Sequence, residues 1–366
     1  IGLRMHRNES GEAGFEVIVG GGQGRTPFVG ETIREWLPPK HLLSYLEAIL
    51  RVYNLDGRRD NKYKARIKIL VRAMGVEAFR NKVDQEWELL RDGPSTLTES
   101  AIDNARSYFR APDYERIDPL AADTALRDVA DTHPEFARWL AHNVHAHKVA
   151  GYAIVTLSLK TTGFAPGDLT DVQMDAVADL ADAYSMGELR TTHQQNLVLG
   201  DVRKSDLYAL WQRASAQNLT SPTVDTLNDI ICCPGGDYCA LANAKSIPIA
   251  EAIQRRFDDL DYLYDLGPID LNISGCMNAC GHHHIGHIGI LGVDKKGVEF
   301  YQVSLGGNSD KDASLGKILG PSFHAEDIPD VIDSLLQTYV EHRQSDESFL
   351  ATYRRIGIDP YKERVY

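Results

Sequence analysis

The chain has 366 residues, of which 43% are hydrophobic, and its formal net charge is −13 at pH 7. This length exceeds what one ordinary core stabilises, so two domains are expected, and the acidic balance argues against general nucleic-acid binding. We find no signal peptide and no apolar run near the roughly 18 residues of a membrane span, and four of the five cysteines form two short pairs, unlike a secreted disulfide framework, which favours a reducing, cytoplasmic setting.

The first predicted elements are a strand over 15–19 and a helix over 42–52, with a glycine-rich segment after the strand. The glycine segment Gly20–Thr26 lacks the Gly-Lys-Ser/Thr ending of a nucleotide-binding P-loop, and no helix opens directly after it. We therefore expect no nucleotide site there.

A basic run follows the first helix and stands out in an acidic chain. Its members are Arg58, Arg59, Lys62, Lys64, Arg66 and Lys68. Arg and Lys hold carboxylate groups through charge-assisted hydrogen bonds, and such a face can also dock an acidic protein. A solvated helix face explains the same run without any ligand.

The middle of the chain predicts a strand, helix, strand, helix order after a charged, proline-containing segment over 92–140. The first helix has a capping-box signal at Thr170 and Gln173, and Gly187 is expected to end it. This order is half of a ferredoxin-like α+β unit. Its predicted elements are strands over 152–159 and 189–199 and helices over 170–184 and 207–216.

The two cysteine pairs carry the strongest chemical signal. Cys233 and Cys239 bound the stretch C-P-G-G-D-Y-C, and Cys276 and Cys280 bound C-M-N-A-C. Four converging thiolates bind a zinc ion or an iron–sulfur cluster. The C-x5-C spacing and the neighbouring glycines favour the cluster, because zinc sites usually draw on pairs two to four residues apart.

Three sets of residues beside the cysteine pairs have a purely structural interpretation as well as a functional one. Cys232 adjoins Cys233 and is expected to be a buried thiol, although it could replace its neighbour as a ligand. Asn278 either hydrogen-bonds a cofactor or shapes the turn between two ligands. A histidine cluster follows Cys280 and either starts a strand or serves a metal or proton transfer. It consists of His282, His283, His284 and His287.

The two ends of the chain share one pattern. Like the segment near the start, a strand over 298–303 leads into Gly306-Gly307 and then into a helix over 328–340. Further on, Gly75 in one region corresponds to Gly357 in the other, at a nearly constant offset. The period is far longer than the 20–50 residues of solenoid repeats. It predicts duplication of a whole module, with only the last part of the first copy before the second.

The motifs C-P-G-G-x-x-C and G-C-x-N-x-C-G resemble those of the siroheme-dependent assimilatory nitrite and sulfite reductases. That family is built from two pseudo-symmetric halves. It also has a G-G-G-x-G-R-T segment like Gly20–Thr26 and an R-x-T-x-x-Q strand like Arg190–Gln195. The resemblance covers nearly all of the chain. It implies an α+β fold of duplicated modules with ferredoxin-like units, the first module being incomplete.

The resemblance also implies the cofactors and their ligands. A 4Fe-4S cluster would be held by Cys233, Cys239, Cys276 and Cys280, and Cys280 would bridge it to a siroheme iron. Further cofactor contacts are expected from Arg25, Arg59, Lys62, Arg66, Arg190, Gln195 and Asn278. The cationic residues that bind the substrate anion would lie upstream of Ile1, so the catalytic residues stay unassigned and the chain alone is not expected to turn over.

The implied activity is the six-electron reduction of nitrite to ammonia or of sulfite to sulfide. Electrons would come from a ferredoxin or a flavoprotein. The rival hypotheses are an iron–sulfur electron-transfer protein without siroheme and a four-cysteine zinc module. The expected boundaries are 1–91 for the first siroheme-binding module, 92–140 for a linker or helical excursion, 141–218 for the ferredoxin-like half-domain, and 219–366 for the cluster and siroheme domain.

Overall fold

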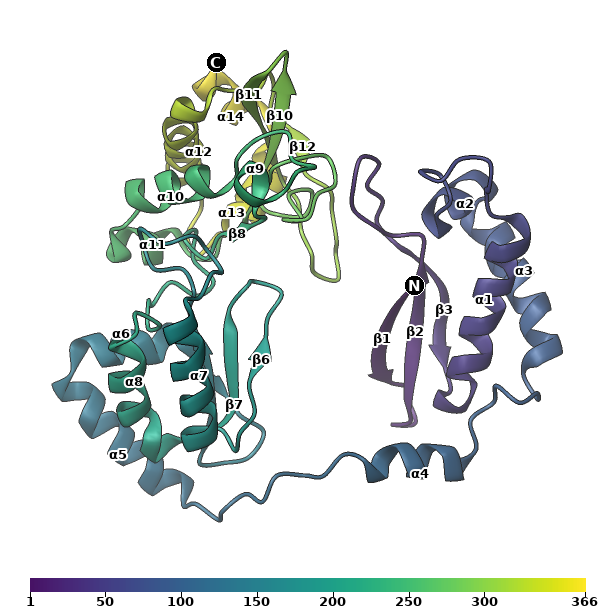
Figure 1. Ribbon diagram of the computed structural model, residues 1–366, viewed down its shortest axis with the longest axis horizontal. Helices are drawn as coiled ribbons and strands as arrows, with labels where there is room; N and C mark the ends of the chain where they lie inside the picture. Colours follow the sequence, from purple (N-terminus) through teal and green to yellow (C-terminus); the bar gives the residue numbers. More distant parts are fainter. The chain divides into compact units, whose positions relative to one another are not determined.

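The computed structural model describes residues 1–366, which divide into two compact units, Ile1–Ala111 and Pro112–Tyr366 (Figure 1). Each unit is described by itself. None of the helices is both long and apolar enough to cross a membrane.

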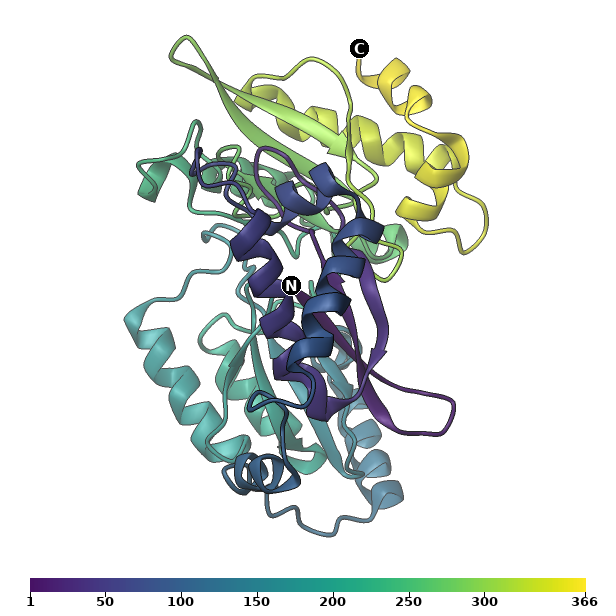
Figure 2. The same ribbon diagram turned by 90° about the vertical axis from the view of Figure 1, so that its right-hand side faces the viewer.

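The first unit is a three-stranded antiparallel sheet covered on one face by helices. Its strands lie in the order β1-β2-β3, and Gly2 of β1 pairs with Ile18 of β2. Helices α1 and α3 pack side by side on the sheet (Figures 1 and 2). Val17, Ile49 and Phe79 are fully buried between these layers. The elements are β1 (Gly2–Arg7), β2 (Ala13–Val19), β3 (Glu31–Leu37), η1 (Pro39–His41), α1 (Leu42–Asp56), α2 (Ile67–Met74), α3 (Val76–Leu90) and α4 (Glu99–Ser107).

The second unit begins with an antiparallel sheet in the order β4-β5-β7-β6, packed against helices around a core that includes Trp139, Val155 and Leu199. The capping box at Thr170 and Gln173 is confirmed, with both reciprocal hydrogen bonds present. The elements are α5 (Pro119–Thr132), α6 (Pro134–Asn143), β4 (Val144–Ala146), β5 (Tyr152–Leu157), α7 (Asp171–Tyr184), β6 (Arg190–Thr191), β7 (Leu197–Arg203), η2 (Lys204–Asp206) and α8 (Leu207–Ser215).

The single strand predicted over 189–199 is wrong, because this segment is a hairpin of two strands. Strand β6 pairs with β7 in antiparallel register, with Thr191 opposite Leu197. The turn between them closes through Gln195, whose φ of +59° is in the left-handed region. No glycine marks this turn, so the residue pattern looked continuous.

The rest of the second unit is a five-stranded sheet in the order β12-β11-β10-β9-β8, with helices packed against it (Figure 1). Strands β8, β9 and β10 run parallel, and β11 is antiparallel to β10 and β12. The elements are β8 (Ile231–Cys232), α9 (Gly235–Tyr238), α10 (Ile247–Arg256), α11 (Leu260–Leu266), β9 (Leu271–Ser274), β10 (Ile288–Lys295), β11 (Val298–Leu305), β12 (Lys317–Ile318), η3 (Ala325–Asp327), α12 (Ile328–His342), α13 (Phe349–Ile356) and α14 (Asp359–Val365).

The predicted duplication is confirmed element by element. In both copies an antiparallel strand pair leads through a glycine loop to a 15-residue helix, α1 or α12, and then to an eight-residue helix, α2 or α13. Both short helices stop at a glycine with positive φ, Gly75 at +87° and Gly357 at +79°. The loop glycines correspond as well, since Gly20 has a φ of +78° and Gly306 one of +85°.

Candidate metal centre

The two cysteine pairs meet at the carboxyl ends of neighbouring strands in the five-stranded sheet. Cys233 directly follows β8, and Cys276 lies just beyond the neighbouring strand β9. Because β8 and β9 are parallel, their carboxyl ends lie at the same end of the sheet. The backbone N–H of Gly275 donates to Sγ of Cys233 at 3.1 Å, and the N–H of Cys233 donates to the carbonyl of Ile273 at 3.1 Å. The loops that carry the two pairs are therefore bonded to each other.

All four thiols lie close enough to interact electrostatically. The pKa of Cys280 is raised, first by burial of the thiol and then by the charges of Cys233, Cys276 and Cys239. Cys233 and Cys276 are buried, Cys239 is half-buried and Cys280 is exposed. No group of three or more His, Cys, Asp or Glu side chains is tight enough for one metal ion.

The backbone around Cys280 adopts an unusual conformation. Ala279 and His282 have φ of +58° and +56°, values that non-glycine residues rarely adopt. A Cβ at Gly281 would lie 1.9 Å from the carbonyl oxygen of Ile273, so only glycine fits. The N–H of Gly281 donates to Oγ of Ser274 at 3.1 Å. Strained residues that the surroundings hold in place concentrate at functional sites, which supports a specific role for this loop.

The ferredoxin-like half-domain holds the first cysteine loop in place. The side-chain amide of Gln195 donates to the carbonyl of Cys232 at 2.9 Å and accepts from its N–H at 2.8 Å. Asn196 donates to Asp229 at 2.9 Å, and the buried ammonium of Lys160 donates to the carbonyl of Ile230 at 2.7 Å. Gln195, which the family resemblance placed at a cofactor, thus has its amide engaged with the backbone next to a ligand.

Cys232 has the environment expected of a buried thiol. It is 3% exposed, and its Sγ lies 3.2 Å from the carbonyl oxygen of Cys233. Burial, and then the neighbouring Cys233, raise the pKa of this thiol far above its usual value. The backbone N–H of Gly275, beside the second cysteine pair, donates to Sγ of Cys233 and not to that of Cys232, which favours Cys233 as the ligand.

The histidines after Cys280 occupy different environments. His283 is 3% exposed, and burial lowers its pKa to about 3, so its ring is neutral at physiological pH. His287 accepts a hydrogen bond from the N–H of Asp270 at 3.1 Å. His282 is exposed, as is Asn278 between the two ligands of the second pair.

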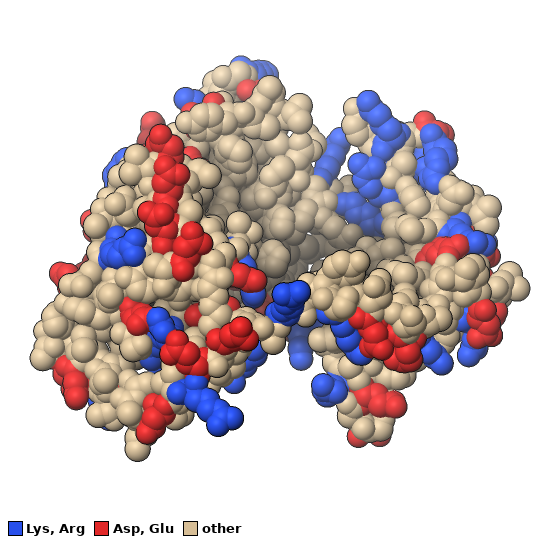
Figure 3. Space-filling model, turned by 60° about the horizontal axis from the view of Figure 1, so that its bottom comes forward, with Lys and Arg blue, Asp and Glu red and all other residues tan.

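Four of the candidate cations lie in the first unit, where Lys and Arg side chains gather (Figure 3). Arg25, Lys62 and Arg66 are exposed, and the guanidinium of Arg59 lies 4.8 Å from the ring centre of Tyr53. A surface pocket of about 390 Å³ lies beside them. It is lined by Gly21, Gly22, Gln23, Tyr53, Ala65, Arg66, Ile67 and Lys68.

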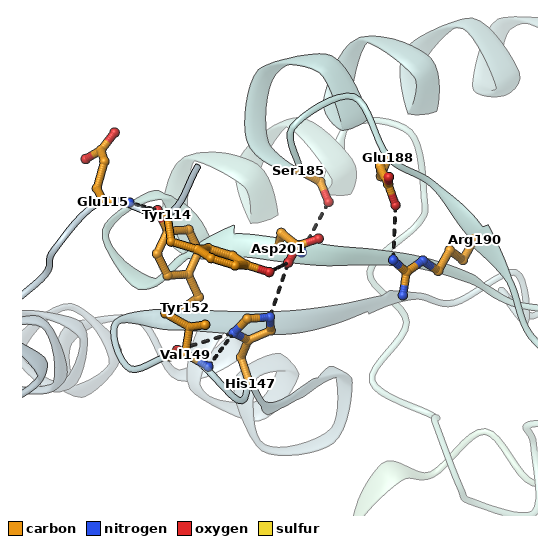
Figure 4. Close-up of polar contacts among 9 residues, drawn as sticks. All are labelled: Tyr114, Glu115, His147, Val149, Tyr152, Ser185, Glu188, Arg190 and Asp201. Atoms are coloured by element: carbon orange, nitrogen blue, oxygen red, sulfur yellow. Dashed lines mark hydrogen bonds and ion pairs between the residues drawn. The ribbon is translucent and has the colours of Figure 1, made fainter. Parts of the chain in front are cut away.

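Arg190 is the candidate cation of the half-domain. It is exposed and forms an ion pair with Glu188 at 3.0 Å (Figure 4). Nearby, the carboxylate of Asp201 accepts hydrogen bonds from Tyr114 at 2.5 Å and from Nε2 of His147 at 3.2 Å (Figure 4). The N–H of Val149 donates to Nδ1 of His147, which leaves Nε2 as the donor. Sequence reasoning missed this network, because Tyr114 and Asp201 are far apart in the chain.

Comparison with known proteins identifies the family of this arrangement. Residues 1–89 and 223–366 match the nitrite and sulphite reductase 4Fe-4S domain. The chain belongs to this family. The segment between these matches fits the same assignment, since residues 147–217 match the nitrite/sulfite reductase ferredoxin-like half domain. The family description specifies an iron–sulfur domain, which favours a cluster over zinc at the four cysteines.

Curated relatives agree with the family match. "Sulfite reductase (ferredoxin) 1" of Mycolicibacterium paratuberculosis is 27% identical over 92% of this chain and 55% of its own length. "Ferredoxin--nitrite reductase" of Synechococcus elongatus is 27% identical over 90% of this chain and 57% of its own length. The chain thus spans about half the length of the curated relatives it matches. The fold is similar to that of the NirA protein of Mycobacterium tuberculosis, with a TM-score of 0.73 and 24% identity over 98% of this chain and 60% of that one.

Proposed function

We propose that this chain is part of an enzyme that reduces nitrite to ammonia or sulfite to sulfide with six electrons. In this proposal Cys233, Cys239, Cys276 and Cys280 hold a 4Fe-4S cluster, and the sulfur of Cys280 also contacts a siroheme. The bound cofactors supply the electron transfer, and the protein supplies orientation, charge and access for protons.

The observation that carries the proposal is the contrast in exposure within one group of four thiols. Cys233 and Cys276 are buried, whereas Cys280 is exposed. A sulfur shared between two cofactors must be accessible on the side away from the cluster. Ala279 and His282 have positive φ, which non-glycine residues rarely adopt, and a Cβ at Gly281 would clash with Ile273, which supports a demand on the position of Cys280.

The protein's own groups have defined tasks in this proposal. Burial of Cys233 and Cys276 keeps water from two sides of the cluster, and the amide of Gly275 offsets thiolate charge on Cys233. Siroheme carries eight carboxylates, so Arg25, Arg59, Lys62, Arg66 and Arg190 are assigned to contacts with them. Asn278, exposed between two ligands, is assigned to a cofactor contact.

The electron donor and the division of the chain complete the proposal. The two relatives named above are described as ferredoxin enzymes, which supports a ferredoxin as the donor, with a flavoprotein as the alternative. The proposed boundaries are 1–91 for the first module, 92–140 for the connecting segment, 141–218 for the half-domain and 219–366 for the cluster domain.

The deciding experiment measures cofactor content and turnover of the intact protein. We expect iron, acid-labile sulfide and siroheme absorption bands, and steady-state reduction of both anions by reduced ferredoxin. Iron and sulfide without siroheme bands would leave an electron-transfer protein, and zinc without sulfide would leave a structural module. In Cys280→Ser, coupling between the two cofactors and six-electron turnover should be lost. Full activity of that variant would exclude the bridging role.

A further inference from the structure

We propose that Ser246, which is not a ligand, sets the reduction potential of the cluster by donating a hydrogen bond to the sulfur of Cys233. This inference rests on the proposed cluster ligation and adds a tuning residue to it. Oγ of Ser246 lies 3.4 Å from Sγ of Cys233, and Ser246 is completely buried. A thiolate ligand has no proton, so the hydroxyl is the donor once the cluster is bound.

The position of Ser246 in the fold shows that its hydroxyl is free for this partner. Ser246 is the N-cap residue of the ten-residue helix α10, yet its side chain makes no capping hydrogen bond. Serine at an N-cap usually accepts from an N–H of the first helical turn. Here the hydroxyl lies against the sulfur instead, and the helix gives up that stabilisation.

Two glycines make room for the hydroxyl. A Cβ at Gly235 would lie 2.5 Å from Oγ of Ser246, and one at Gly275 would lie 2.9 Å from it. Any larger residue at either position would push the hydroxyl away from Cys233. Gly235 lies within the first ligand loop and Gly275 directly precedes the second, so both loops approach the same serine.

Backbone hydrogen bonds fix the segment that ends at Ser246. The carbonyl of Ala244 accepts from the N–H of Gly236 at 2.9 Å, and the N–H of Ala244 donates to the carbonyl of Gly275 at 3.0 Å. The segment is thus bonded to both ligand loops. Because the backbone that leads to Ser246 is fixed, little backbone entropy is lost when the hydroxyl donates to the sulfur. The free energy of this hydrogen bond is therefore not reduced by an ordering cost.

The chemistry predicts the direction of the effect. Sγ of Cys233 receives two donors, the hydroxyl of Ser246 and the amide of Gly275. Donors to a ligand sulfur withdraw negative charge, which stabilises the reduced and more negative form of the cluster. Ser246 therefore raises the reduction potential and favours electron entry into the cluster.

The test is an EPR-monitored redox titration of the holoprotein in four forms: wild type, Ser246→Ala, Ser246→Cys and Ser304→Ala. Ser304 is a matched control, because its buried hydroxyl donates to the carbonyl of Gly289 in the same sheet. In Ser246→Ala we expect about a tenfold lower ratio of reduced to oxidised cluster at a fixed potential. For a one-electron couple this is a shift of about 59 mV to more negative values.

Ser246→Cys keeps a weaker donor, so its shift should be smaller, and Ser304→Ala should match wild type. The iron–thiolate stretching bands in resonance Raman spectra should rise in frequency in Ser246→Ala, rise by less in Ser246→Cys and stay unchanged in Ser304→Ala. An unchanged potential in a fully loaded Ser246→Ala protein overturns the inference. Loss of the cluster from both Ser246 variants also overturns it, and assigns the serine to cluster assembly. Absence of a cluster from wild type would instead refute the ligation itself.

Discussion

The two modules share one frame but hold their glycine loops differently. In the first unit the ammonium of Lys68 reaches back from α2 and donates to the carbonyls of Gln23 and Thr26 at 2.6 and 2.8 Å. In the second unit Arg354 of α13 pairs with the carboxylate of Asp312 beyond the loop. The order of the elements and the lengths of the first two helices are kept, whereas β3 and α3 are longer than β12 and α14 and the residues in the connections differ. The two modules therefore share an order of strands and helices, and the residues that give each module its own chemistry lie in the loops.

Substitution of the cysteines should have the largest effect on what distinguishes the two modules, because all five cysteines lie in the second unit. Cys276→Ala removes a buried ligand, so we expect nearly complete loss of bound iron and sulfide. Cys232→Ser, which alters a non-ligand thiol beside the site, should keep both. Iron and sulfide assays on the purified proteins decide the matter. A loaded Cys276→Ala protein, or an empty Cys232→Ser protein, would contradict the ligand assignment.

The paired loop glycines should differ in their tolerance of a methyl group. At Gly306 a Cβ would lie 2.0 Å from Cε1 of Tyr353, whereas at Gly20 the nearest atoms belong to Val71, 3.1 Å away. Both positions have positive φ, which costs a non-glycine residue roughly 1–2 kcal/mol. Overpacking adds about 1–3 kcal/mol at Gly306 only. Urea unfolding should show a larger loss for Gly306→Ala than for Gly20→Ala, and equal losses would show that the loops pack alike.

The buried Lys160 should make stability depend on pH. Burial lowers its pKa to about 8, with Asp229 and Cys232 partly offsetting this effect. The unfolded chain thus binds the proton more tightly, so the free energy of unfolding rises as pH increases from about 8 to 10.5. At about 1.4 kcal/mol per pH unit, the gain is about 3 kcal/mol.

Lys160→Met should remove this slope. The measurement is urea unfolding of wild type and variant at several pH values, taken as a difference so that other groups cancel. Lys317→Met, which alters an exposed lysine of the same unit, is the matched control and should leave the slope in place. Parallel curves for wild type and Lys160→Met would exclude the titration of Lys160 as its source.

The smallest expected effect is the difference in stability between the Lys68 contact of the first loop and the Arg354–Asp312 ion pair of the second. Arg354 and Asp312 are 42% and 61% exposed, and exposed ion pairs contribute about 0–1 kcal/mol. Lys68 makes two short hydrogen bonds to carbonyls, and such bonds from a charged group contribute about 1.5–3 kcal/mol. Unfolding free energies should therefore fall more in Lys68→Met than in Arg354→Met. The reverse order would mean that the second loop depends on its ion pair.

Sequence reasoning succeeded where the signal is local. The capping residues Thr170 and Gln173 act through neighbours in the chain, so they can be identified without knowledge of the fold. The stop predicted at Gly187 lies beyond the observed end, because α7 ends at Tyr184 with Ser185 as its C-cap. The duplication was visible because whole elements recur in order. The cysteine motifs are specific enough to indicate the family from the sequence alone.

Sequence reasoning failed where residues far apart in the chain determine the local structure. The turn at Gln195 is held by the side chain's two bonds to Cys232, and nothing in the local sequence predicts a left-handed glutamine. Ser246 precedes helix α10, and its approach to Cys233 depends on how three loops fold together. Contacts such as Tyr114 to Asp201 likewise require the tertiary fold.

Strand β8 is the outer edge of the five-stranded sheet. An open edge presents unpaired N–H and C=O groups that can recruit a strand from another molecule and begin aggregation. The amide of Gln195 occupies both backbone groups of Cys232 at that edge. A side chain satisfies these groups without offering a new row of donors and acceptors, so the ladder ends there. Gln195 thereby closes this edge of the sheet to other chains at Cys232, directly beside the first cysteine of the pair.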